Sequence, residues 1–345
     1  MKIRQKDCVC EIAQHAAVLG DETAAARAPI VESGPIAILP ERRDNGTPGD
    51  VFGEAVTVAG GTLHPLSEVT RGLIWLSYKK SAELGEVLDA NPQLTWVQLP
   101  WAGVDAYAEV LARCARPGLV FTSAKGSYAQ PVAEHALGMT LALLRAFPRR
   151  ARATSWDGVP RGISLYRKNV TIIGAGGIAR ELIRLLEPFD VTITVVRRSA
   201  GQVPGAFSTV TTDRLDKALS SADVVVVAAA LTGETRHLIG EHELALMKET
   251  AVLVNIARGP LVDPDALVAA LNSEKIFGAA LDVTEPEPLP DGHPLWTAQN
   301  ILITPHMADT PDMTAPLLAE RIRTNVAAFL GGERFTGVVD PSVGY

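Results

Sequence analysis

Cysteine is scarce in this sequence of 345 residues, which contains only Cys8, Cys10 and Cys114. Three cysteines are too few to cross-link a chain of this length, and a single Cys-Val-Cys without further ligands nearby is a weak metal signal. We therefore expect a reducing compartment, the cytoplasm, and no metal site.

The sequence also lacks an excess of positive charge and long apolar runs. It has 32 Lys and Arg against 39 Asp and Glu, a net charge of -7 that offers no overall attraction to a phosphate backbone. We therefore do not expect nucleic acid as a partner. Glu11, Gln14 and His15 interrupt the apolar stretch near the N-terminus, so neither a signal peptide nor a membrane-spanning helix is predicted.

The remaining composition, 47% hydrophobic and 21% charged, is that of a globular protein, and 345 residues suggest two domains. We interpret residues 1–33 as an N-terminal extension with one helix over residues 11–19. From Ile36 onward, short apolar runs alternate with helical or turn segments, which predicts a parallel sheet. These runs are residues 36–39, 55–58, 72–76, 94–99 and 119–122.

A long apolar helix is predicted over residues 132–147, ended by Pro148, with His135 as a packed core residue. A second and clearer series of alternating strands and helices follows Trp156. Its strands are predicted at residues 169–174, 191–196, 223–228, 251–255, 278–281 and 301–304. Its helices are predicted at residues 176–186, 215–219, 241–247 and 264–272, and a C-terminal helix at residues 313–330 ends at Gly331.

The segment VTIIGAGGIA, residues 170–179, ends a predicted strand and opens a predicted helix. Gly174 permits a tight turn, Gly176 lets a pyrophosphate approach the backbone, and Ala179 lets the helix pack closely on the strand. This context predicts a dinucleotide site, whereas the same glycines alone would be an ordinary strand-to-helix turn.

An NAD-binding domain usually places an acidic residue at the end of its second strand, to bind the adenosine ribose. This chain has Arg197, Arg198 and Ser199 there instead. Two guanidiniums and a hydroxyl are suited to a 2'-phosphate, so we predict NADP, with NAD possible. The alternative is that the two arginines are only solvated at an exposed strand end.

Several further motifs occur in one order along the chain. They are WAGVD at 101–105, PVAEHA at 131–136, LTGETR at 231–236, VNIARGPLVD at 254–263, LDVTEPEP at 281–288 and TPH at 304–306. With the glycine loop, they resemble the D-isomer-specific 2-hydroxyacid dehydrogenase family over residues 72–330. The Arg-Arg-Ser strand end and the run at 72–75 are most similar to glyoxylate and hydroxypyruvate reductases.

The resemblance implies an α/β fold of two domains. A flavodoxin-like substrate domain would comprise residues 34–130 completed by 309–345, and a Rossmann-type doubly wound dinucleotide-binding domain would comprise 131–308. The active site would lie in the cleft between them, and relatives are usually homodimers. The implied activity is reduction of a small 2-oxo acid to the D-2-hydroxy acid.

The family's catalytic triplet corresponds to Arg258, Glu287 and His306. Arg258 would bind the substrate carboxylate and polarise the keto oxygen, since its guanidinium forms a fork. His306 would donate the proton, and Glu287 would orient and charge His306. Glu285 is the competitor for the role of Glu287, and the family match favours Glu287.

The resemblance also implies the remaining binding residues. Those expected at the cofactor are Gly174, Gly176, Gly177, Ile178, Arg197, Arg198, Ser199, Ala229, Ile256, Ala257, Asp282 and Ala308. Those expected at the substrate are Trp75, Trp101, Ala102, Gly103 and Arg258, with either tryptophan equally well a core residue.

Two departures from the family pattern, the run at 228–231 and the size of Trp101, weaken any transfer of substrate identity. A catalytically silent dinucleotide sensor on the same fold remains an alternative, as do oxidation of formate or phosphite and oxidation of phosphoglycerate. Formate dehydrogenases pair the histidine with Gln where this chain has Glu287. A phosphoglycerate enzyme fits less well, because a C-terminal regulatory domain is missing and the strand end carries two arginines.

Overall fold

The computed structural model describes residues 31–40, 50–77, 79–156, 158–331 and 334–341. The chain divides into two compact units. The central unit is Ala129–Asp309, and the discontinuous unit combines Met1–Tyr128 with Thr310–Tyr345. The sequence placed these crossings near residues 131 and 308. The helix predicted over residues 11–19 lies outside the described residues.

The discontinuous unit is built on a parallel sheet of four strands in the order β1-β2-β3-β4. A single parallel bridge between Ile36 and Leu63 extends it beyond β1. Counting that bridge as a short second strand gives the flavodoxin-like order 2-1-3-4-5. The strands are β1 Ile36–Leu39, β2 Gly72–Trp75, β3 Trp96–Gln98 and β4 Val120–Thr122.

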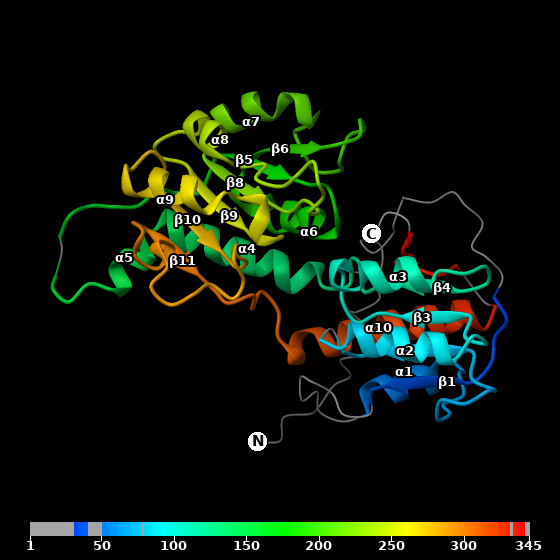
Figure 1. Ribbon diagram of the computed structural model, residues 1–345. Coiled ribbons are helices and arrows are strands. Elements are labelled where there is room, and N and C mark those ends of the chain that lie inside the picture. The colour runs from blue at the N-terminus through cyan, green and yellow to red at the C-terminus, as the bar shows by residue number, and fades with distance from the viewer. Residues whose placement is uncertain (1–30, 41–49, 78, 157, 332–333, 342–345) are drawn as a thin grey trace, which may run out of the picture. The chain divides into compact units, whose positions relative to one another are not determined.

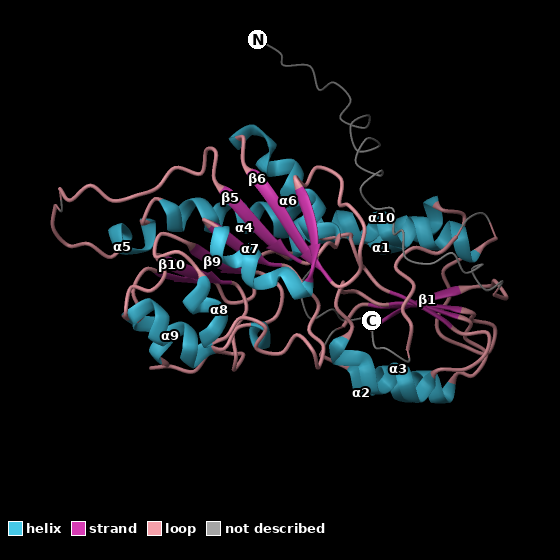
Figure 2. Ribbon diagram, turned by 90° about the horizontal axis from the view of Figure 1, so that it is seen from above, coloured by secondary structure: helices cyan, strands magenta, loops and turns pink. Residues whose placement is uncertain are grey.

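Helices cover both faces of this sheet, as Figure 2 shows. Helices α1 (Val51–Val58) and α10 (Pro311–Phe329) pack together on one face, and α2 (Ser81–Ala90) and α3 (Ala108–Cys114) pack together on the other. The strand predicted at residues 55–58 was wrong, because these residues are the end of α1. A four-residue apolar run does not by itself distinguish a strand from a buried helix face.

The central unit holds a parallel sheet of seven strands in the order β11-β10-β9-β8-β5-β6-β7. Counted within the unit, the order from β7 is 3-2-1-4-5-6-7, which is the Rossmann order with one added strand. The α/β fold of two parallel sheets predicted from the sequence is confirmed. The strands are β5 Asn169–Ile173, β6 Thr192–Arg197, β7 Ser208–Thr211, β8 Val224–Val227, β9 Val252–Asn255, β10 Gly278–Leu281 and β11 Ile301–Ile303.

The inner strands β8, β9 and β10 are buried along their whole length, which matches a parallel sheet covered on both faces. Figure 1 shows α4 and α6 along one face and α7, α8 and α9 along the other. These helices are α4 Ala129–Leu144, α6 Gly177–Leu186, α7 Leu215–Ser221, α8 Glu241–Leu246 and α9 Pro264–Asn272. Short 3-10 turns are Asp105–Tyr107, Glu187–Phe189, Thr212–Arg214, Gly259–Leu261 and Pro294–Thr297.

The long helix predicted over residues 132–147 is two helices. α4 ends at Leu144, Ala146 takes a left-handed φ of 53°, and α5 (Phe147–Ala151) begins there. Pro148 stands in the first turn of α5, where its missing N–H leaves no hydrogen bond unmade, so it opens a helix where a stop was predicted. In the part of the chain that the structure describes, no helix combines the length and apolar character needed to cross a bilayer.

Candidate active site

The predicted catalytic and cofactor residues of the central unit follow the carboxyl ends of its strands. Parallel strands bring these ends to one edge of the sheet, where ligands of open α/β sheets bind. The residues come from five loops and one strand end: Gly174 after β5, Arg197 at the end of β6, Ala229 after β8, Arg258 after β9, Glu287 after β10 and His306 after β11.

The glycine loop has the geometry that a pyrophosphate requires. Gly174 has a φ of +113°, and a Cβ there would overlap the carbonyl oxygen of Ala228. Gly176 is the N-cap of α6, and a Cβ there would meet no protein atom within 4 Å. The backbone is therefore open at the amino end of α6, where amide hydrogens and the helix dipole favour a phosphate.

Two arginines stand in sequence at the end of β6. Arg197 is half-buried, and Arg198 and Ser199 are exposed. Among the described residues, no carboxylate lies within ion-pair distance of either arginine. Both are therefore available to an anion.

The turn after β9 is held by a buried asparagine. The Asn255 side-chain amide donates to the Arg258 carbonyl at 2.9 Å, and its oxygen accepts the Ala257 N–H at 3.1 Å. The Arg258 guanidinium donates to the Ala257 carbonyl at 2.7 Å. A Cβ at Gly259 would overlap the Thr284 carbonyl, so this turn packs directly on the loop that carries Glu287.

Glu287 and His306 form a hydrogen-bonded pair. The His306 Nδ1 lies 2.7 Å from the Glu287 Oε1, and the Thr284 N–H donates to the other carboxylate oxygen at 3.3 Å. Both side chains are solvent-accessible. With Nδ1 bonded to Glu287, the His306 Nε2 is the ring nitrogen left for another partner.

Glu285, the competitor for this role, is engaged elsewhere. Its carboxylate accepts hydrogen bonds from Arg236 and from the His237 Nε2, the latter at 2.8 Å. Burial alone raises the pKa of Glu285, but the bonds from His237 and Arg236 lower it below the usual value. Glu285 thus ties the loop after β8 to the loop after β10 and does not contact His306.

Asp282 holds the loop that carries His306. The N–H groups of three consecutive residues, His306, Met307 and Ala308, donate to the Asp282 backbone carbonyl at 2.7 Å and to its two carboxylate oxygens at 2.8 and 3.1 Å. Burial raises the pKa of this carboxyl, but hydrogen bonds from His135, Thr304 and Met307 outweigh it and lower the pKa. Asp282 was predicted as a cofactor contact, and that role stays a prediction; what the structure shows is its contact with the loop at residues 306–308.

His135 is a residue that sequence reasoning misplaced. It was predicted to pack in the core, yet its ring is 23% exposed, and its Nε2 lies 3.0 Å from the Thr304 hydroxyl and 3.5 Å from Asp282. A histidine on an apolar helix carries no sequence signal for this contact. Its polar partners, Thr304 and Asp282, are distant in the sequence, and only the fold brings them close to His135.

Asp309 also went unnoticed in the sequence. Burial raises the pKa of its carboxyl, the nearby charge of Asp282 raises it further, and His306 and His135 act in the opposite direction. A second acidic group therefore lies in the electrostatic environment of His306.

The two tryptophans of the discontinuous unit differ from each other. Trp75 is 2% exposed, packs in the core of that unit and donates its indole N–H to the Ser77 carbonyl at 2.7 Å. Trp75 is therefore a core residue of that unit, which is one of the two alternatives that the sequence left open. Trp101 is half-buried and meets Tyr128 edge-on, with ring centroids 5.8 Å apart.

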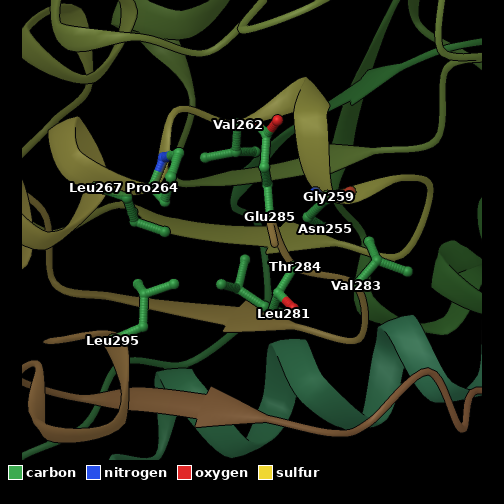
Figure 3. A pocket seen from close by; sticks show the side chains of 10 residues that line it. All are labelled: Asn255, Gly259, Val262, Pro264, Leu267, Leu281, Val283, Thr284, Glu285 and Leu295. Carbon is green, nitrogen blue, oxygen red and sulfur yellow. The ribbon is translucent and has the colours of Figure 1, made fainter. Parts of the chain in front are cut away.

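Figure 3 shows a small pocket beneath the turn at Gly259 and the loop at Glu285. Its volume of about 10 Å³ is room for one water at most. It is therefore a packing gap between the two loops and no binding site for a dinucleotide or an organic acid.

The central unit thus combines a Rossmann-type sheet, a glycine loop open at a helix N-terminus, and an arginine turn beside a paired histidine and glutamate. Such a combination defines a dinucleotide-dependent α/β oxidoreductase.

Comparison with known proteins identifies the family. Residues 137–308 match the model of the D-isomer specific 2-hydroxyacid dehydrogenase NAD-binding domain. A glyoxylate reductase of Thermofilum pendens is 35% identical over 269 residues, which cover 75% of this chain and 78% of the relative. The chain belongs to the D-isomer specific 2-hydroxyacid dehydrogenase family; it is an NAD(P)-dependent oxidoreductase, as the sequence predicted.

The chain is also similar to two further proteins, of which the second is named as a member of this family. A protein from the proB 3' region of Corynebacterium melassecola is 38% identical over 298 residues, which cover 84% of this chain and 95% of that one. A D-isomer specific 2-hydroxyacid dehydrogenase of Xanthobacter autotrophicus, solved with NADPH and MES, superposes with a TM-score of 0.73 at 29% identity, covering 91% of this chain and all of the other.

Proposed function

We propose that this protein reduces a small 2-oxo acid of the glyoxylate or hydroxypyruvate class to the D-2-hydroxy acid, with NADPH as the preferred donor. The observation that carries the proposal is the His306–Glu287 hydrogen bond at the same sheet edge as the Arg258 turn and the glycine loop. Similarity to glyoxylate reductases supports the substrate class.

Each residue has a distinct part in the proposed reaction. Arg258 binds the carboxylate with its fork and polarises the keto oxygen. His306 donates a proton from Nε2 to the forming alkoxide, while Glu287 holds Nδ1 and stabilises the imidazolium. A nicotinamide cofactor, when bound, would supply the hydride. Trp101 and the amides of Ala102 and Gly103 are the further substrate contacts we propose.

The glycine loop fits the dinucleotide. We propose that Gly176, Gly177 and Ile178 contact the pyrophosphate, because they form the amino end of α6. Asp282 and the chain around it complete the site toward the nicotinamide. The proposed contacts there are Ala229, Ile256, Ala257 and Ala308.

A panel of 2-oxo acids, assayed with NADPH and with NADH, tests the proposed function. We expect glyoxylate and hydroxypyruvate to be reduced, and we expect no oxidation of formate. Tight NADPH binding without turnover of any 2-oxo acid would instead identify the protein as a dinucleotide sensor.

Exchange of Arg197 for Asp should reverse the preference for NADPH. One charge-assisted hydrogen bond to the 2'-phosphate is worth roughly 1.5–3 kcal/mol, so we expect the wild type to favour NADPH at least about tenfold in kcat/KM. In the Arg197→Asp variant a carboxylate repels the phosphate and accepts from the ribose hydroxyls of NADH. Steady-state kinetics with both donors measure the ratio.

Arg167→Asp is the matched control, since Arg167 is exposed and precedes β5, at the amino ends of the strands. It should leave the NADPH to NADH ratio unchanged. A wild-type preference for NADH, or an unchanged ratio in Arg197→Asp, would show that Arg197 and Arg198 are only a solvated strand end.

We also propose that the protein is a homodimer, as members of this family usually are, and that it is cytoplasmic, as its few cysteines suggest. The segment from α5 to β5 carries Phe147, Trp156, Val159 and Tyr166 with large exposed apolar surface, and Trp156 is 99% exposed. Figure 1 shows this segment extending away from the sheet of the central unit. Exposed apolar side chains gathered on one segment favour a protein interface.

Trp156→Ser should therefore weaken the dimer. Aromatic anchors contribute much of the binding energy of an interface, so we expect the dissociation constant to rise about tenfold or more. Light scattering during size exclusion, over a dilution series, measures it. Phe207→Ser, at another strongly exposed aromatic residue, is the control and should not change the dissociation constant. A monomeric wild type would contradict the proposal.

A further inference from the structure

We propose that His135 and Thr304 are positioning residues for His306, acting through a one-way chain of hydrogen bonds that ends on Asp282. The inference rests on the proposed role of His306 as proton donor. It adds two residues to the site, and neither of them was assigned there from the sequence.

The loop that carries His306 is stabilised by hydrogen bonds to a residue outside the loop. His306 has a φ of +54°, a left-handed conformation that is uncommon for a residue with a side chain and persists where surrounding contacts favour it. These contacts are the hydrogen bonds from the N–H groups of residues 306–308 to Asp282. The position of the His306 ring thus depends on where the Asp282 carboxylate points.

The direction of each hydrogen bond in the chain follows from simple counting. The Asp282 carboxylate is ionised and can only accept, so the Thr304 hydroxyl at 2.6 Å must donate its single hydrogen to it. The Thr304 oxygen is then left to accept, and the His135 Nε2 at 3.0 Å must be its donor. The chain runs from His135 through Thr304 to Asp282 and fixes the tautomer of His135 with Nε2 protonated.

His135 reaches this chain from α4, a helix that contributes none of the proposed catalytic or cofactor residues. It lies close enough to Asp282 for an ion pair when it is protonated, at 3.5 Å. A histidine that only filled space in the core would need neither contact. We infer that α4, through His135 and Thr304, orients the Asp282 carboxylate and thereby stabilises the loop at residues 306–308.

Any test of this proposal has to separate the effect of charge on His306 from the effect of the hydrogen bonds. His306 is faced by Glu287 and Asp309, while Asp282 and His135 lie behind its loop. Replacing His135 with a neutral residue removes a possible positive charge whatever else it does. Matched pairs of equal charge remove this ambiguity.

Two such pairs are available. Thr304→Val removes the hydroxyl and keeps the shape, whereas Thr304→Ser keeps the hydroxyl. His135→Leu removes the donor, whereas His135→Gln offers an amide N–H near the position of Nε2. Either pair alone tests the proposal if a member of the other fails to fold.

The first readout is steady-state turnover of a 2-oxo acid. We expect kcat to be about tenfold or more lower in the Val and Leu variants than in their Ser and Gln partners, because small displacements of a reacting group are costly. The KM of the 2-oxo acid should stay within about threefold across all four, since Arg258 holds the substrate.

The second readout does not depend on turnover. In protein with isotope-labelled histidine, the NMR signals of the ring nitrogens of His306 report its hydrogen bond to Glu287, with His306→Ala used to assign them. The Val and Leu variants should move the Nδ1 signal of His306 away from its wild-type position, whereas their Ser and Gln partners should keep it. A kcat that differs while the Nδ1 signal does not, or equal values of both within each pair, would overturn the proposal. If the wild type reduces no 2-oxo acid, the proposed function fails, and the NMR signals still decide the hydrogen-bond chain.

Discussion

Replacing His306 with Ala should reduce kcat about 10²- to 10⁴-fold, the range expected when a general acid is removed. The dissociation constant of NADPH should stay nearly the same. This division follows from the structure. Among the described residues, the His306 side chain forms a hydrogen bond with Glu287 alone, and the glycine loop and Arg197 belong to other segments of the chain. Stopped-flow turnover and fluorescence titration of NADPH measure the two quantities.

The matched control is His242→Ala. His242 lies on α8, is exposed and bonds to Asp216, away from the loops that carry Arg258, Glu287 and His306. It should leave both quantities unchanged. If His306→Ala turned over at near the wild-type rate, His306 would have no part in proton transfer.

Arg258→Lys should lower kcat/KM about 10- to 100-fold, although the positive charge is kept. A lysine is a point charge and cannot make the two parallel hydrogen bonds by which a guanidinium holds a carboxylate. Loss of one such bond is worth roughly 1.5–3 kcal/mol, which sets the expected range. The turn itself should survive, since Asn255 binds backbone atoms of residues 257 and 258.

Kinetics with the best 2-oxo acid of the panel measure this effect, and Arg214→Lys serves as the control. Arg214 is exposed and contacts only Asp213 in the salt bridges of the described chain, so its exchange should be silent. Arg258→Lys with wild-type kcat/KM would mean that the substrate carboxylate is held by another group.

Much of the fold of the central unit could be predicted, because its strands and turns are indicated by the residues of their own short segments. Strands such as VVVV at β8 and VLVN at β9 are continuous apolar runs, and parallel strands covered on both faces have this form. The tight turn at Gly174, whose φ is +113°, is likewise indicated by the glycines of one short segment. The parallel sheet then brings the carboxyl ends of its strands to one edge, so the grouping of the predicted residues followed from the parallel arrangement of the strands.

What the sequence could not predict depends on contacts between distant residues. The strand β7, with the sequence STVT, is a half-buried edge with no apolar run to mark it. Trp75 reads equally as core or as site until its burial is known. His135 has two polar partners, Thr304 and Asp282, which lie more than a hundred residues further along the chain. No local sequence pattern indicates such contacts.

The reaction of hydroxypyruvate with NADPH tests the central claim most directly, provided that the chirality of the product is determined. Hydride transfer to one face of a substrate held at Arg258, with the proton donated by His306, predicts the D-2-hydroxy acid alone, formed in equal amount to the NADPH consumed. The L-enantiomer, a racemic product, or no reaction with hydroxypyruvate or any other 2-oxo acid would contradict the account.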